Sequence, residues 1–258
     1  MSIEQVVIIE FLEKYSAQEH EDRVLNHVQE KFGEWIQLFS PNEKAAVLEM
    51  IKCFSYYSGN TVRQFLVDLS NRLRLEFDLD LNSALFTYIK KENGRICSSV
   101  DYWTDFRRIN NLPTENCIDD LNSFPEECWK RVNNVVIIDD CCNTGSSLEE
   151  YIKKSTKNFE GKSVFFVVIC SMQAANEKLQ DLGEEIHATI HLVSAEIQDK
   201  AFLKAEINRC CSADCFSRFS TSLGIPLSYS LGKYSSQSLM AFYNNTPNNT
   251  IGAFWYPT

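Results

Sequence analysis

Apolar residues recur at helical spacing through the first third of the chain. An interval of three or four residues places their side chains on one face, so each run predicts an amphipathic helix. Four segments carry the pattern: 3–17, 22–39, 44–57 and, opening at Asn60 or Thr61, 62–77. The pattern predicts an all-helical subdomain over residues 1–80, packed on the rest of the chain.

The third of these helices has the clearest start. Ser40 is a favoured cap, Pro41 suits the first turn, and Glu43 stands three residues after Ser40, in the capping-box position. The helix is therefore expected to begin at Pro41.

Beyond residue 82 the apolar residues gather into short runs that alternate with helical segments. Strands are predicted at 83–91, 135–138, 162–171 and 188–195, and helices at 148–154, at 172–183 ending at Gly183, and at 202–209. This alternation predicts an α/β fold over residues 81–258, with a parallel sheet and right-handed crossovers. In such sheets ligands bind at the carboxyl ends of the strands.

The run Val135–Ile152 carries the strongest candidate chemistry. Asp139 and Asp140 follow a buried strand, and the small, polar loop 141–147 leads into a helix. Backbone amides and hydroxyls at a helix start form a phosphate-binding geometry. The two aspartates would repel phosphate, so they suit ribose hydroxyls or a water-bridged Mg²⁺. The alternative is a structural strand whose aspartates only cap the next helix.

Composition limits the partners of the chain. It has 258 residues, 44% of them hydrophobic, a net charge of −10 and an isoelectric point near 5.0. The acidic balance argues against a broad basic face for nucleic acid. No stretch is long and apolar enough to span a membrane, and the N-terminus has acids where a signal peptide needs bases, which favours a cytoplasmic protein.

The cysteines show no metal-binding spacing. There are ten, none in a CxxC pair, and they are expected to be reduced thiols of a cytosolic protein. Cys211 and Cys215 together with His187 and His191 offer an alternative metal site, which we disfavour because the histidines lie in a predicted strand segment.

The sequence resembles the type I phosphoribosyltransferases. The resemblance rests on the strand Val135–Ile138, the pair Asp139–Asp140, and Thr144, Gly145 and Ser147. Response-regulator receivers also end strands with acids, but they lack the Thr-Gly-x-Ser loop. The resemblance implies a site for phosphoribosyl pyrophosphate (PRPP), with its 5′-phosphate in the loop and its ribose at the acidic pair.

The resemblance also implies residue roles. Asp139 and Asp140 would be the catalytic residues and would hold Mg²⁺. The phosphate would be bound by Cys142, Asn143, Thr144, Gly145, Ser146 and Ser147, and the pyrophosphate by Lys90, Lys91, Arg95, Arg107 and Arg108.

A second resemblance involves the C-terminal segment NNTPNNT, residues 244–250, which is followed by Phe254 and Trp255. It is similar to the phosphoribosyltransferase-like branch found in bacterial conflict and anti-phage systems, some of them retron-associated, and covers about residues 80–258. The alternative is a surface loop with an aromatic anchor.

Three functions remain open from the sequence. The first is a protein that acts at the ribose C1 of PRPP or a nucleotide, by glycosyl transfer or N-glycosidic cleavage, as an effector in anti-phage defence. The second is a non-catalytic module that senses PRPP or nucleotide and regulates a partner. The third is a scaffold whose N-terminal helices bind a partner protein or ribonucleoprotein.

Overall fold

The computed structural model describes residues 3–16, 31–90 and 99–256. Contacts divide the chain into two compact units. We call Val62–Gln198 the sheet unit, and Met1–Thr61 with Asp199–Thr258 the terminal unit. The sequence predicts a division near residue 80, whereas the contacts group the N-terminal residues with the C-terminal segment.

The sheet unit contains a four-stranded sheet in which every pairing is parallel. Its strands are β2 (Leu85–Tyr88), β3 (Asn134–Cys142), β4 (Ser163–Met172) and β5 (Thr189–Gln198), in the order β2-β3-β4-β5. The predicted α/β fold with a parallel sheet is therefore confirmed.

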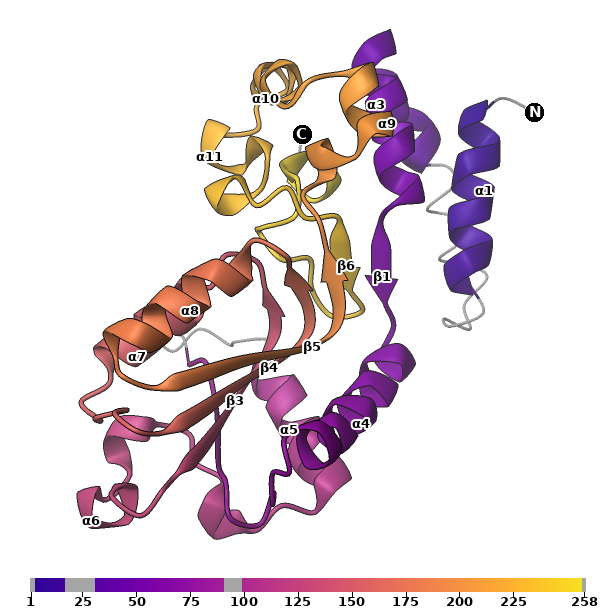
Figure 1. Cartoon of the computed structure of the whole chain (residues 1–258). Helices are drawn as coiled ribbons and strands as arrows, with labels where there is room; N and C mark the ends of the chain where they lie inside the picture. The colour runs from indigo at the N-terminus through magenta and orange to yellow at the C-terminus, as the bar shows by residue number, and fades with distance from the viewer. Residues whose placement is uncertain (1–2, 17–30, 91–98, 257–258) are drawn as a thin grey trace. The chain divides into compact units, whose positions relative to one another are not determined.

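Helices cover both faces of this sheet. On one face lie α7 (Ser146–Lys154) and α8 (Ala175–Glu185), and on the other lie α5 (Ser99–Asn110) and α4 (Gly59–Glu76, from Val62 onward), as Figure 1 shows. Short turns complete the unit: η2 (Thr114–Asn116), η3 (Leu121–Ser123) and α6 (Glu126–Trp129). Because both faces are covered, Val135 to Ile138 are fully buried, as their uninterrupted apolar run predicts.

The terminal unit is mostly helical, with a two-stranded parallel sheet of β1 (Ser55–Tyr57) and β6 (Met240–Phe242). Its helices are α1 (Ile3–Ser16), η1 (Ile36–Leu38), α3 (Pro41–Lys52), η4 (Ala201–Leu203), α9 (Ala205–Cys210), α10 (Ala213–Ser222), α11 (Leu227–Ser230), η5 (Lys233–Ser235) and η6 (Gly252–Phe254). One core joins both ends of the chain, since Val47 and Met50 belong to the same buried cluster as Ile207 and Phe216.

Several predicted elements have other bounds in the structure, and the helix predicted over 202–209 is divided into η4 and α9. Helix α3 begins at Pro41 as expected but ends at Lys52, and Ser55–Tyr57 form strand β1 instead of further helix. Helix α8 continues through Gly183, which the sequence suggested as its end. A Cβ at Gly183 would lie 2.9 Å from the carbonyl oxygen of Ala188, so the glycine permits a close approach rather than a helix stop.

Two predictions are tested only in part. The helix predicted at 22–39 is seen from residue 31, where residues 31–35 are helical and η1 follows, and its earlier part lies outside the described residues. In the described ranges, no helix has the length and apolar character needed to cross a bilayer.

Candidate functional site

Asp139 and Asp140 lie within the last residues of β3, at the carboxyl edge of the sheet. They are 9% and 7% exposed, so both carboxylates are largely removed from water. Asp139 Oδ1 accepts the amide of Asp140 at 2.9 Å, and Asp140 Oδ1 accepts the amide of Cys141 at 2.7 Å. These bonds fix the two side chains beside the loop that follows.

The turn into α7 depends on Gly145. Its φ of +74° lies in the left-handed region, and a Cβ there would lie 3.0 Å from Leu179 Cδ2 of α8. Glycine therefore allows both the backbone conformation and the close approach of the loop to α8. Helix α7 starts at Ser146, one residue later, so its first amides face the loop.

Short polar contacts organise the loop. The hydroxyl of Thr144 donates to Ser146 Oγ at 3.1 Å. The side-chain nitrogen Nδ2 of Asn143 donates to Cys141 Sγ at 3.1 Å. Asn143 Oδ1 is buried and has no hydrogen-bond partner among the residues that the structure describes. A buried polar atom without a partner is costly, and a ligand that supplied a donor or a cation here would remove that cost.

A lysine that the sequence analysis missed completes this group. Lys178 Nζ of α8 lies 2.8 Å from Ser146 Oγ and 2.7 Å from Glu149 Oε2. Hydrogen bonds from Lys178 and then Lys153 lower the pKa of Glu149. Helix α7 and strand β4 separate Lys178 from the loop in the sequence. Its position beside the loop results from the crossover that returns the chain from β4 to α8.

The loop thiols are not suited to nucleophilic chemistry. Burial raises the pKa of Cys142 to about 12, and burial followed by the charges of Asp140 and Asp139 raises the pKa of Cys141 well above its usual value. Both are therefore neutral thiols near pH 7. The Cys142 side chain belongs to the apolar core, so only its backbone is available to a phosphate.

The residues predicted to bind pyrophosphate either follow β2 in the sequence or lie in α5. Lys90 is exposed just after β2, and Lys91 and Arg95 lie outside the described residues. Arg107 contacts Thr114 Oγ1 at 3.1 Å and the ring of Trp103, and Arg108 is exposed.

The direction of α5 explains this placement of Arg107 and Arg108. The hydroxyl of Ser99, the first residue of α5, donates to the Ile89 carbonyl just beyond β2. Farther along, Trp103 meets Tyr88 and Phe106 meets Phe86, so the helix runs back along the strand. Its arginines therefore lie toward the opposite edge of the sheet from Asp140.

The asparagine-rich segment, residues 244–250, is held by hydrogen bonds to neighbouring parts of the terminal unit. The Asn248 carbonyl accepts the Lys233 amide at 2.8 Å, and the Thr250 hydroxyl donates to the Met240 carbonyl at 2.7 Å. The Trp255 ring nitrogen donates to the Thr250 carbonyl at 2.8 Å. The segment thus forms a turn that is bonded to β6 and to Trp255.

Comparisons with known proteins give one match to a family and one to a solved structure. The AQ2163 protein from Aquifex aeolicus aligns with 11% identity and a TM-score of 0.33, covering 72% of this chain and 94% of that one. No curated protein matches the chain. The model of the PRTase-CE family matches residues 32–258. Because this match spans most of the sequence, the chain belongs to the PRTase-CE family, a phosphoribosyltransferase-like family.

Proposed function

We propose that the loop Asn143–Ser147 binds a phosphate of PRPP or of a nucleotide, and that the protein acts at the ribose C1 of that ligand. The observation that carries the proposal is the convergence of the α7 amides, the hydroxyls of Thr144 and Ser146, and the Lys178 ammonium group beside a buried acidic pair. Donors and a cation favour a phosphate, and carboxylates favour hydroxyl groups.

Mg²⁺ fits this site by its donor set. Asp139 and Asp140 would supply carboxylate oxygens and Asn143 its unpartnered Oδ1, and oxygen ligands of this kind are those that Mg²⁺ prefers. Bound Mg²⁺ would neutralise charge on the pyrophosphate group. The residues of the chain would hold the 5′-phosphate and orient the ribose while the bond from C1 to pyrophosphate breaks and a nucleophile adds to C1.

One observation favours the second function, binding without turnover. Pyrophosphate is a highly charged leaving group, and Arg107 and Arg108 do not lie at the loop. The chain would then sense PRPP or nucleotide and regulate a partner. Release of pyrophosphate or free base from PRPP or nucleotides with Mg²⁺ supports the catalytic form, and saturable binding without release supports the sensing form.

Two lysines test the phosphate site. Lys178 and Lys153 both pair with Glu149 and are 40% and 44% exposed, but Lys178 alone of the two also contacts Ser146. We expect Lys178→Met to weaken PRPP binding by about tenfold, because a charge-assisted bond is lost. Lys153→Met should change it by less than about twofold. Equal effects of both variants, measured by calorimetry, would contradict the proposal.

The role in anti-phage defence and the partner remain proposals that rest on the second sequence resemblance. Expression of the chain with its neighbouring genes in bacteria challenged with phage tests them. Protection that is lost in the variant with Asp139→Asn and Asp140→Asn supports an effector role, and protection that persists in that variant contradicts a role for this site.

A further inference from the structure

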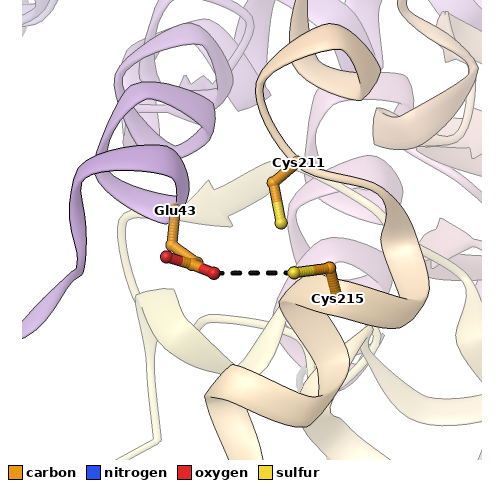
Figure 2. Close-up of side chains that lie close together, drawn as sticks. All are labelled: Glu43, Cys211 and Cys215. Atoms are coloured by element: carbon orange, nitrogen blue, oxygen red, sulfur yellow. Dashed lines mark hydrogen bonds between the residues drawn. The ribbon is translucent and has the colours of Figure 1, made fainter.

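Three side chains that could bind a metal meet in the terminal unit, remote in sequence from the loop. They are Glu43, Cys211 and Cys215, and one ligand atom from each lies within 4.8 Å of the others. Cys215 Sγ lies 3.6 Å from Glu43 Oε1 (Figure 2). The carboxylate and the two sulfur atoms point toward one another from separate elements.

The elements that carry these side chains are well defined. Glu43 lies in the first turn of α3, and its other carboxylate oxygen accepts a hydrogen bond from the Ser40 hydroxyl. Cys211 follows the end of α9, and Cys215 lies in the first turn of α10, where its amide donates to Ser212 Oγ. Ser212 therefore caps α10, whereas Ser40 bonds to the Glu43 side chain and makes no capping bond to the backbone of α3, so the predicted capping box is not formed.

A bound cation would balance the charge of the buried Glu43 carboxylate. Glu43 is 6% exposed and Cys211 is 5% exposed, and no lysine, arginine or histidine pairs with Glu43 in the described part of the chain. A buried carboxylate is normally paired or bound to metal, and here its partners are one hydroxyl and one thiol.

We propose that Glu43, Cys211 and Cys215 form a site for Zn²⁺ or a similar divalent transition metal. Two thiolates exclude Mg²⁺ and Ca²⁺ as preferred occupants. Ordinary zinc bonds in tetrahedral geometry place sulfur and oxygen ligands about 3.5 Å apart and two sulfurs about 3.8 Å apart. The observed 3.6 Å between Cys215 Sγ and Glu43 Oε1 meets this requirement.

The bonds and protons balance simply. One divalent cation displaces the protons of both thiols, which pass to the solvent, and gains two sulfur bonds and one oxygen bond. A water molecule would fill the fourth position. The metal would link α3 to the connection between α9 and α10, so it would join sequence positions 43 and 211–215 within one unit.

The test uses the full chain, freed of metal and kept reduced with a phosphine. Co²⁺ is titrated first and then displaced by Zn²⁺, with absorbance, bound metal by mass spectrometry and melting temperature as readouts. We expect about one equivalent of metal, a thiolate-to-cobalt charge-transfer band and a higher melting temperature with metal.

Three variants identify the ligands. Cys215→Ser and Glu43→Gln should each weaken Zn²⁺ binding by about tenfold or more. Cys210→Ser is the matched control, because the Cys210 thiol adjoins Cys211 in sequence but donates to the Glu206 carbonyl at 3.3 Å. Binding that is unchanged in Cys215→Ser and Glu43→Gln, or a cobalt complex without the charge-transfer band, would overturn the proposal.

A measurement on the unmodified chain covers the case in which a variant does not fold. Zn²⁺ should slow alkylation of Cys211 and Cys215 relative to Cys210 in peptide mapping. Equal alkylation rates with and without Zn²⁺ would overturn the proposal. A disulfide between Cys211 and Cys215 that persists in the phosphine would also overturn it.

Discussion

At the scale of single residues, we expect ligand binding to depend on the two buried aspartates at the end of β3. Each accepts the amide of the next residue through Oδ1, a bond that an asparagine side chain can also accept. We therefore expect the double variant with Asp139→Asn and Asp140→Asn to lose Mg²⁺-dependent PRPP binding, while its free energy of unfolding changes by only about 1 kcal/mol.

Asp120→Asn is the control for this double variant. Asp120 also accepts a backbone amide, that of Asn122, but its replacement should leave PRPP binding unchanged. Binding by calorimetry and unfolding in urea separate the two effects. If the double variant loses its folding stability together with PRPP binding, the aspartates have a capping role instead.

Gly145 permits a second prediction at this scale. Gly145→Ala places a Cβ in the left-handed region and 3.0 Å from Leu179, so both binding and stability should fall, the backbone strain alone costing about 1–2 kcal/mol. Gly161→Ala is the matched control, since Gly161 has a φ of +72° and no described atom lies within 4 Å of its added Cβ. It should lose similar stability yet bind PRPP normally, and a loss of binding in the control would show that strain alone abolishes it.

At the scale of elements, the sequence predicts best where local pattern and tertiary environment agree. The uninterrupted run Val135–Ile138 is a buried strand because helices cover both faces of the sheet. Strand β1 was missed because Ser55–Tyr57 is short and acquires its partner, β6, from the far end of the chain. The positions of Lys178 beside the loop and of Glu43 beside two cysteines were not predicted for the same reason, since packing between distant elements sets their neighbours.

A substitution at Gly183 tests whether glycine is needed there for the close approach of α8 to Ala188. Alanine in a helix interior is ordinarily better than glycine by about 1 kcal/mol, but here its Cβ would lie 2.9 Å from the Ala188 carbonyl oxygen. We expect Gly183→Ala to destabilise the protein. Gly33→Ala, in the helical segment 31–35 and clear of every described atom within 4 Å, should be neutral or stabilising. Chemical denaturation compares the two, and stabilisation by Gly183→Ala would refute the close-approach explanation.

At the scale of the whole molecule, the two ends of the chain fold as one unit. The sequence predicts a helical subdomain over residues 1–80, packed on the rest of the chain, and partner binding by its helices is one of the functions that the sequence leaves open. The structure gives their apolar residues a structural role, because Ile36, Phe39 and Met50 share a core with Ile207 and Phe216. Composition could not indicate this grouping, since it arises from contacts between distant parts of the sequence.

Deletion of residues 1–61 should therefore leave the terminal unit without half of its core. We expect the remainder to be insoluble or to lose its cooperative melting transition, because large buried side chains lose their packing partners. Solubility and calorimetry are the measurements. A soluble, cooperatively folded remainder would instead favour a separable N-terminal layer with a partner of its own.

We expect the loop Asn143–Ser147 to hold a phosphate beside the acidic pair. A crystal structure with PRPP and Mg²⁺ tests it most directly. We predict one phosphate group within hydrogen-bond distance of the first amides of α7 and of Lys178 Nζ, with the ribose hydroxyls facing Asp139 or Asp140. A loop that stays empty at saturating PRPP, or PRPP bound elsewhere, would contradict it.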